Sequence, residues 1–269
     1  LSQELPAEIR GYPTKLEYHE DGLMQHRMTV LTVRHFFESV LTFNPAGDLH
    51  AADWLSIPEF RLGMVTAGRV FHDGLGELEP LRARLHYYPR DVWLYMLAAQ
   101  WQRIAQEEPF MGRCGQVDDE LGSRLVAARL VRDLMRLCFL MERTYTPYIK
   151  WFGTAFAHLD CGDKLTPILL SVLESRSWHE REKYLTTAYE FVAGMHNDLG
   201  ITEPLSTRVS QFYLRPFFVI KAERFVSAIR AAITSKEVRA LPEHLGAVDQ
   251  FVDSTDALNE PAWSKELYQ

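Results

Sequence analysis

The sequence of 269 residues lacks several features by which protein classes are recognised. Its three cysteines, Cys114, Cys138 and Cys161, are widely spaced and form no CxxC motif. Neither a disulfide framework nor a zinc site built on thiolates is therefore expected. No run of about 20 apolar residues occurs, so no membrane-spanning helix is predicted. We expect a cytoplasmic protein with no membrane partner.

The common catalytic motifs are also missing. The ten histidines do not fall at the spacing of metal ligands, and no HExxH occurs. There is no GxxxxGK[ST], no GxGxxG and no GxSxG, so neither a phosphate loop nor a nucleophile elbow is predicted. The residues given therefore contain no complete catalytic motif, and we assign no metal ligand among them.

The chain has fewer basic residues (29) than acidic residues (36). The formal net charge is −7, which gives no general attraction to nucleic acid, so no nucleic-acid partner is expected. Hydrophobic residues make up 47% of the chain and charged residues 24%, as in a packed globular protein. Aromatic residues make up 12%, and they fit a large core as well as a stacking pocket.

Periodicity predicts a mainly α protein, a helical bundle preceded by a short β-hairpin or edge-strand segment. Residues 12–18 and 27–33 are rich in β-formers and flank the turn sequence Asp21-Gly22. We expect a β-containing segment over residues 1–45, a helical bundle over 46–258 and a loose tail over 259–269. Apolar spacing of three and four predicts the helices. They are expected at 35–41, from 51, at 91–108, 118–143, 148–159, 166–175, 178–199 and 215–234.

The segment 118–143 is apolar around most of its circumference, which is typical of a helix at the centre of a bundle. Arg129, Arg132 and Arg136 lie on one face of it, at i, i+3 and i+7. Such a row can bind phosphate or carboxylate. It can also pair internally with Asp133, Glu107 or Glu108, as buried arginines normally do. We favour internal pairing.

Two adjacent acids, Glu107 and Glu108, end the preceding helix just before Pro109. A carboxylate beside a loop can act as a general base, and acids are unfavourable at a helix C-terminus. A solvated pair of acids is the commoner arrangement. Both interpretations stay open, with the second favoured.

The aromatic segment that contains Tyr148 and Lys150 follows Pro147 and opens a predicted helix. Lys150 in the first turn opposes the helix dipole, and an anion bound there would resolve the conflict. An aromatic hinge whose lysine reaches water explains the same residues. Farther on, a triplet of acids could bind a cation, but it lacks the other residues of a calcium loop, so surface acids are favoured. The triplet is Asp249, Asp253 and Asp256.

Six runs of residues resemble an uncharacterised family of bacterial nucleotidyltransferase-like proteins. The chain is similar to the helical part of such proteins, as in aminoglycoside and lincosamide nucleotidyltransferases. The runs are Ala51–Leu55, Val65–Gly74, Tyr88–Tyr95, Ala128–Phe139, Lys150–Phe156 and Ala247–Asp253.

The resemblance implies a catalytic core with a Gly-Ser turn and a metal-binding Asp-x-Asp, followed by a helical domain. No Gly-Ser followed by a strand-borne Asp-x-Asp occurs in the residues given. We therefore expect the core to lie before Leu1. The implied reaction transfers a nucleoside monophosphate from ATP to a hydroxyl, with Mg²⁺ held by acids outside this chain. A nucleotide, a small-molecule acceptor and a further copy of the chain are the expected partners.

The resemblance also suggests roles for individual residues. Lys150 looks like a lysine that similar domains present to nucleotide phosphates. Glu107 or Glu108 looks like the base that acts on the acceptor hydroxyl. Arg132, Arg136 and Tyr148 complete the candidates for nucleotide binding. The alternative function, of a different class, is a non-catalytic helical module that binds a small molecule or a partner protein.

Overall fold

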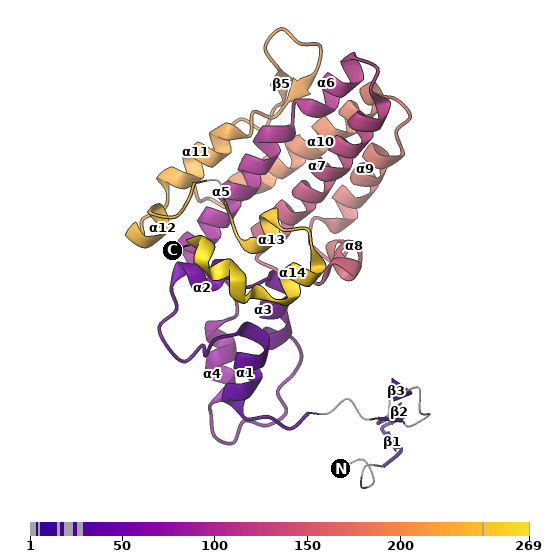
Figure 1. Cartoon of the computed structure of the whole chain (residues 1–269). Helices are drawn as coiled ribbons and strands as arrows, with labels where there is room; N and C mark the ends of the chain where they lie inside the picture. Colours follow the sequence, from indigo (N-terminus) through magenta and orange to yellow (C-terminus); the bar gives the residue numbers. More distant parts are fainter. Residues whose placement is uncertain are drawn as a thin grey trace.

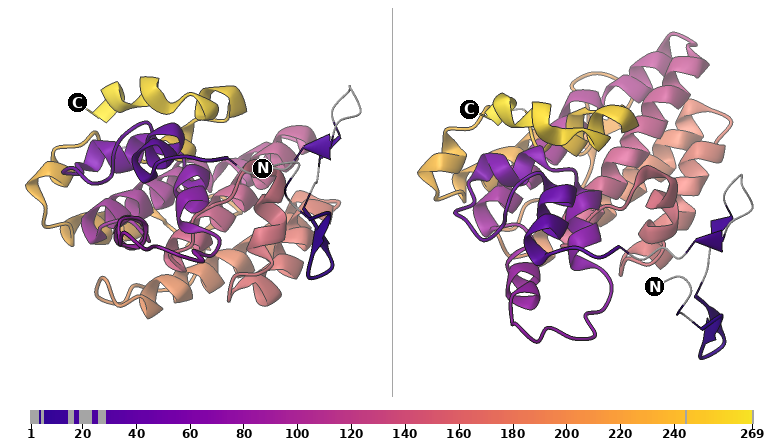
Figure 2. Two further views of the ribbon diagram at one scale, coloured as in Figure 1. Left: turned by 90° about the horizontal axis from the view of Figure 1, so that it is seen from below. Right: turned by 60° about the horizontal axis from the view of Figure 1, so that its bottom comes forward.

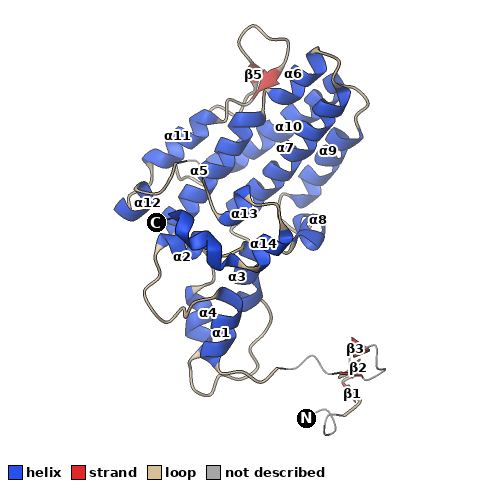
Figure 3. Cartoon of the chain, in the orientation of Figure 1, coloured by secondary structure: helices blue, strands red, loops and turns tan. Residues whose placement is uncertain are grey.

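The computed structural model describes most of the chain, and most of what it describes is helical (Figures 1 and 3), so the predicted mainly α fold is confirmed. The described residues are residue 4, residues 6–14, 17–18 and 24–25, and then residues 29–243 and 245–268. No helix among these residues is long and apolar enough to cross a membrane.

The N-terminal residues form two small antiparallel pairs of strands. β1 (Glu8–Ile9) pairs with β2 (Tyr12–Pro13), and β3 (Glu17–Tyr18) pairs with β4 (Met24–Gln25). Arg10 and Gly11 join the first pair with φ of 52° and 80°, which is the backbone of a tight two-residue hairpin loop. A short N-terminal hairpin is thus confirmed, although its strands and turn differ from those predicted, and the predicted turn at Asp21-Gly22 lies outside the described residues. Figures 1 and 2 show the strands beside the helical part, not within it.

The strand predicted over 27–33 is wrong where the structure describes it. Residues 29–32 form no strand, and residues 27 and 28 lie outside the described residues. The Thr32 hydroxyl accepts a hydrogen bond from the backbone N–H of His35 and caps α1 (Val33–Leu41). Because α1 buries Phe37 and packs against α3 (Glu59–Thr66), the predicted boundary at residue 45 is also wrong. The helical part begins with α1.

The remaining elements follow in chain order. They are α2 (Ala51–Ser56), α4 (Leu78–Arg84), α5 (Arg90–Glu107), α6 (Phe110–Gln116), α7 (Glu120–Met141), the 3₁₀ helix η1 (Ile149–Trp151), α8 (Phe152–Phe156), α9 (Gly162–Glu174), α10 (Trp178–Asp198), β5 (Ser210–Gln211), β6 (Phe218–Val219), α11 (Glu223–Ala231), α12 (Lys236–Arg239), α13 (Val248–Phe251), α14 (Thr255–Asn259) and the 3₁₀ helix η2 (Pro261–Tyr268). A helix was predicted over 215–234, but its first part is strand and loop, because Lys221 has a φ of 56°.

The long helix α7 lies at the centre of the bundle, as its apolar pattern predicted. It packs against α5, α6, α9 and α10, and Leu130, Leu134 and Leu137 have no exposed surface. Its first turns differ from the prediction, because Leu121 and Leu125 are exposed. The Asp119 carboxylate caps the helix by accepting a hydrogen bond from the N–H of Gly122. The buried part of α7 is therefore its C-terminal portion.

The helix α5 is the second buried helix. Every residue from Val92 to Trp101 is buried. The Trp101 ring stacks on Phe225 of α11, with ring centroids 4.2 Å apart and planes 10° apart. Aromatic contact of this kind adds about 1 kcal/mol to the burial of apolar surface. Together α5 and α7 form a rigid floor for the elements that cross them.

The C-terminal arm, defined here as residues 248–268, lies across the N-terminal helices (yellow in Figures 1 and 2). The predicted loose tail over 259–269 is wrong for residues 259–268, which are held in place. The Ser264 hydroxyl donates to the carbonyl of Ser56 at 2.8 Å. The Tyr268 hydroxyl donates to the carbonyl of Gly246 at 3.0 Å, and both side chains are buried. Buried apolar and hydrogen-bonded groups keep this segment folded.

The contrast along α7 gives a test of the fold. Leu134 is fully buried, whereas Leu121 on the same helix is 71% exposed. Leu134→Ala is expected to lower the free energy of unfolding by about 2–5 kcal/mol, because it leaves a cavity in the core. Leu121→Ala should change it by less than about 0.5 kcal/mol. Urea unfolding followed by circular dichroism measures both, and equal losses would contradict the placement of α7.

Candidate functional site

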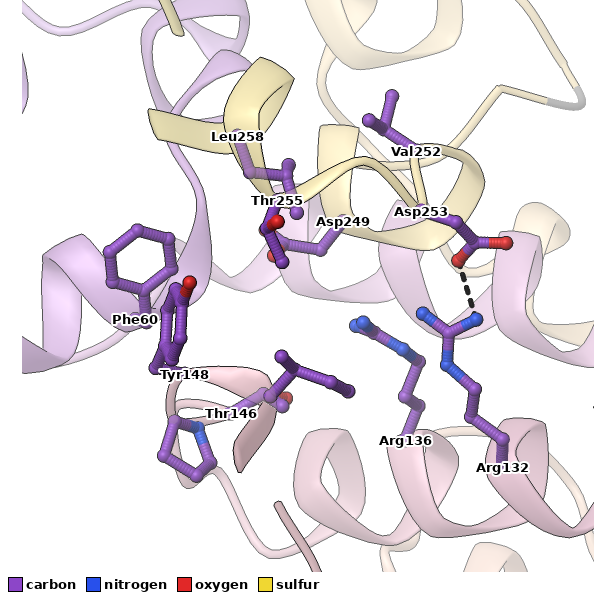
Figure 4. Close-up of a pocket in the computed structure, with 12 residues that line it drawn as sticks. Phe60, Arg132, Arg136, Thr146, Tyr148, Asp249, Val252, Asp253, Thr255 and Leu258 are labelled. Atoms are coloured by element: carbon purple, nitrogen blue, oxygen red, sulfur yellow. Dashed lines mark hydrogen bonds and ion pairs between the residues drawn. The ribbon is translucent and has the colours of Figure 1, made fainter. Parts of the chain in front are cut away.

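One pocket brings together residues of α3, α7, the loop after α7 and the C-terminal arm (Figure 4). Its cavity volume is about 40 Å³, below the usual range for small-molecule sites, so a ligand larger than a small anion would extend into solvent. Three of the four predicted nucleotide-binding residues, Arg132, Arg136 and Tyr148, line it. The complete lining is Phe60, Arg132, Arg136, Thr146, Pro147, Tyr148, Ile149, Asp249, Val252, Asp253, Thr255 and Leu258.

The two arginines come from successive turns of α7. Positions four apart lie on the same face of a helix, so Arg132 and Arg136 point the same way. Figure 4 shows both side chains reaching from α7 towards the C-terminal arm. Arg132 forms a hydrogen-bonded ion pair with Asp253 of the arm. The favoured internal pairing of these arginines is confirmed in kind, although Asp253 was not among the expected partners.

Arg136 is the unusual charge of the pocket. The residue is only 7% exposed, and its ion pair with Glu59, from Nη1 to Oε1, is long at 4.0 Å. Within the described part of the chain, the buried Nη1 has no hydrogen-bond partner. A buried charged donor without a partner costs more than about 1–3 kcal/mol. An anion bound in the pocket would remove this cost.

Two buried carboxyl groups lie beside Arg136. The backbone N–H of Glu59 donates to Oδ2 of Asp249 at 2.8 Å, and Oε2 of Glu59 accepts from the N–H of Thr146 at 2.9 Å. Burial raises the pKa of Glu59 to about 7, and the charge of Asp249 raises it further while Arg136 opposes both. Burial also raises the pKa of Asp249, against the effect of Arg136. Near neutral pH the pair therefore holds a proton for part of the time.

The triplet of C-terminal acids does not behave as surface acids throughout. Asp249 is 6% exposed, so that prediction is wrong for it, because its carboxylate is buried against the backbone N–H of Glu59 at the start of α3. Asp253 and Asp256 are exposed, as predicted. In the part of the chain that the structure describes, no three His, Cys, Asp or Glu side chains are grouped as metal ligands.

The wall opposite the arginines is aromatic. Phe60 of α3 and Tyr148 meet edge to face, with ring centroids 5.4 Å apart and planes at 83°. Thr146 is 5% exposed, and its hydroxyl has no hydrogen-bond partner among the described residues. The pocket thus combines guanidinium groups, a hydroxyl group and aromatic rings. That set can bind an anion attached to a planar or apolar group.

Lys150 lies next to the pocket but does not line it. Its residue is exposed, and its Nζ lies 5.5 Å from the centre of the neighbouring Trp151 ring. The predicted helix start is a short 3₁₀ helix, η1, so the dipole of a long helix does not act there. Of the two interpretations of this segment, the exposed lysine of an aromatic hinge describes the observed position.

The two candidate bases, Glu107 and Glu108, lie outside the pocket. Glu107 pairs with Arg129, as the internal pairing predicted, and burial raises its pKa. Glu108 was expected to be solvated, and that is wrong, because it is 6% exposed. Its carboxylate accepts hydrogen bonds from three successive backbone N–H groups before α11, at 2.7–3.1 Å. Glu108 therefore fixes the start of α11, where an anion is favourable.

Sequence reasoning missed Phe60, Glu59 and Thr146. Phe60 and Glu59 begin α3, far in the chain from the helix that carries the arginines, and only the packing of α3 places them there. Asp249 was singled out, but as one of three surface acids. A local signal for any of them is hard to find, because each has an ordinary role at a helix start or in a loop.

Comparison with known proteins adds one likeness. A family model described as "Domain of unknown function (DUF4037)" matches residues 54–152, which is less than half of the chain. The match runs from α2 to the start of α8 and includes Arg132, Arg136 and Tyr148, but not the C-terminal arm. Neither the curated proteins nor the solved structures gave a match.

The raised pKa of Glu59 predicts a dependence of stability on pH. Between the unfolded value of 4.5 and about 7, the folded state binds more protons, so the free energy of unfolding falls as pH rises. Glu59→Gln cannot titrate and resembles the protonated acid. We expect it to match the wild type near pH 4.5 and to exceed it by about 1–3 kcal/mol at pH 8.

Urea unfolding at a series of pH values measures this difference. Glu108, whose pKa burial also raises to about 7, contributes equally to both proteins and cancels. The exposed Glu77→Gln serves as the control and should give a difference that does not vary with pH. A Glu59→Gln variant that is less stable than the wild type at every pH would refute the shared proton.

Proposed function

We propose that the pocket binds the phosphate of a nucleotide and that this chain is the helical nucleotide- and acceptor-binding part of a nucleotidyltransferase-like protein. The observation that carries the proposal is the nearly buried Arg136, whose Nη1 has no hydrogen-bond partner within the described residues. Arg132 lies one turn away and faces the same pocket. A charged donor left unpaired at a pocket wall favours an anionic ligand.

Phosphate suits this arrangement because it can accept hydrogen bonds from several donors at once. Side chains four residues apart on a helix have Cβ atoms about 5–6 Å apart, so two guanidinium groups can bind one phosphate from one side. The hydroxyl of Thr146, which lies beside Glu59, adds a donor at the same wall. The three groups supply the several donors that phosphate oxygens require.

The apolar part of the pocket suits the rest of a nucleotide. Tyr148 and Phe60 present aromatic surface at one side, and Val252 and Leu258 of the arm contribute aliphatic surface. Aromatic side chains bind the faces of bases at about 1–3 kcal/mol per base. Lys150 follows Ile149 of the lining in the chain, is exposed, and remains our candidate for outer phosphates.

The proposed reaction follows the resemblance of the six runs to nucleotidyltransferase-like proteins. A nucleoside monophosphate would pass from ATP to a hydroxyl, and acids outside this chain would hold the Mg²⁺. Glu107 and Glu108 lie outside the pocket, and both oxygens of Glu108 accept backbone N–H bonds. Glu108 lines a different pocket, together with Lys221 and Arg224, so its role as the base stays a prediction. The role of this chain in the proposal is to bind and orient the nucleotide.

Nucleotide binding gives the direct test. We expect AMP and ATP to bind this chain in isothermal titration calorimetry. Arg136→Gln should lose at least about 10-fold in affinity, because hydrogen bonds to charged groups are worth about 1.5–3 kcal/mol. Arg136→Lys keeps the charge but loses the planar fork of donors, and it should fall between the two.

Arg129→Gln is the matched control. Arg129 lies on the same helix and is 61% exposed, but it pairs with Glu107 outside the pocket. It should bind nucleotide as the wild type does. Equal affinity in the Arg129 and Arg136 variants, with both folded by circular dichroism, would remove the pocket from the proposal. Absence of nucleotide binding to the wild type would instead favour a module that binds another molecule or a partner protein.

A further inference from the structure

The pocket already holds a carboxylate of its own. Asp253, in the loop between α13 and α14, reaches over the rim and pairs with Arg132 (dashed line in Figure 4). Its side chain is 74% exposed, whereas the Arg132 side chain is 33% exposed. Burial would raise the pKa of Asp253, but its hydrogen bond and ion pair with Arg132 outweigh this and lower the pKa. The group is therefore an anion at neutral pH.

The two arginines differ in their hydrogen-bond partners. Arg136, at the floor, is held beside Glu59 and Asp249, and its Nη1 has no hydrogen-bond partner among the described residues. Arg132, at the rim, has a carboxylate partner that can turn into water without uncovering buried surface. The pocket thus has one guanidinium with a donor that lacks a hydrogen bond among the described residues, and one guanidinium that a ligand must take from Asp253.

The charges then divide possible ligands into two kinds. A singly charged anion can pair with Arg136 alone and gains little by replacing Asp253, because one carboxylate-like charge would replace another. A phosphate monoester carries about −1.5 to −2 charges at pH 7. It carries more negative charge than the Asp253 carboxylate that it displaces from Arg132, and this outweighs the loss of the exposed ion pair, which is worth little by itself.

We infer that Asp253 is a specificity-determining residue, which pairs with Arg132 and so selects ligands with a terminal, doubly charged phosphate. The inference rests on the proposed nucleotide binding and adds the class of phosphate. It assigns to the C-terminal arm a part in recognition that lies outside the residues matched by the family model. Phosphate diesters and carboxylates are the ligands that Asp253 rejects.

AMP and 3′,5′-cyclic AMP make the matched pair of probes, because they share base and sugar and differ in the second phosphate charge. In titration calorimetry, the wild type should bind AMP at least 10-fold more tightly than cyclic AMP. Asp253→Asn frees Arg132 without changing the size of the side chain. Both nucleotides should bind it more tightly, cyclic AMP by the larger factor, so that the preference falls to about 3-fold or less.

Asp256→Asn is the control variant. Asp256 is exposed on the same arm, does not line the pocket and has no ion pair among the described residues, yet its substitution changes the net charge equally. It should leave the preference unchanged. An unchanged preference in Asp253→Asn, or the same change in both variants, would overturn the inference while nucleotide binding stands. Failure of the wild type to bind either nucleotide would overturn the proposed function and this inference with it.

Discussion

A positive charge buried on the central helix sets the conditions for much of this structure. Taking a guanidinium group out of water costs several kcal/mol, and only opposite charges and hydrogen bonds return that cost. Glu59 from α3 and Asp249 from α13 both lie beside Arg136. Asp249 also accepts the backbone N–H of Glu59, which joins the start of α3 to the C-terminal arm. The start of α3 and the C-terminal arm thus meet beside the buried charge of α7.

A second polar network holds the arm from behind. The Gln250 amide of α13 donates to the carbonyl of Met96 and to the side chain of Gln100, both on α5. Gln100 in turn donates to Oδ1 of Asp133 on α7, and Arg103 pairs with the same carboxylate. All members of this chain except Arg103 are buried. Of its side-chain oxygens, Oδ2 of Asp133 lacks a hydrogen-bond partner among the described residues, but the remaining bonds tie α13 to α5 and α7 behind the pocket.

How much of this could be predicted from the sequence follows from the range of each interaction. Apolar spacing gave the long helices, because neighbours on a helix face are close in the chain. It also placed Arg132 and Arg136 on one side of α7. Their partners lie more than 70 residues away in the chain and depend on packing that no local pattern encodes. At Thr32 a local pattern was misleading. The residues before α1 are rich in β-formers and were predicted to be a strand, but the Thr32 hydroxyl caps the helix.

Glu108 shows why acids were the least predictable residues. At the end of a helix, a carboxylate looks free to act on a substrate. Its partners are the backbone N–H groups of residues 220–222, which carry no sequence signal at all. The same holds for Asp249, whose donor is a backbone N–H at the start of α3. We therefore expect the buried and the exposed charges of the pocket to act differently on a ligand. A buried floor with fixed partners can supply affinity, whereas an exposed ion pair worth at most about 1 kcal/mol can be exchanged and so can discriminate between ligands.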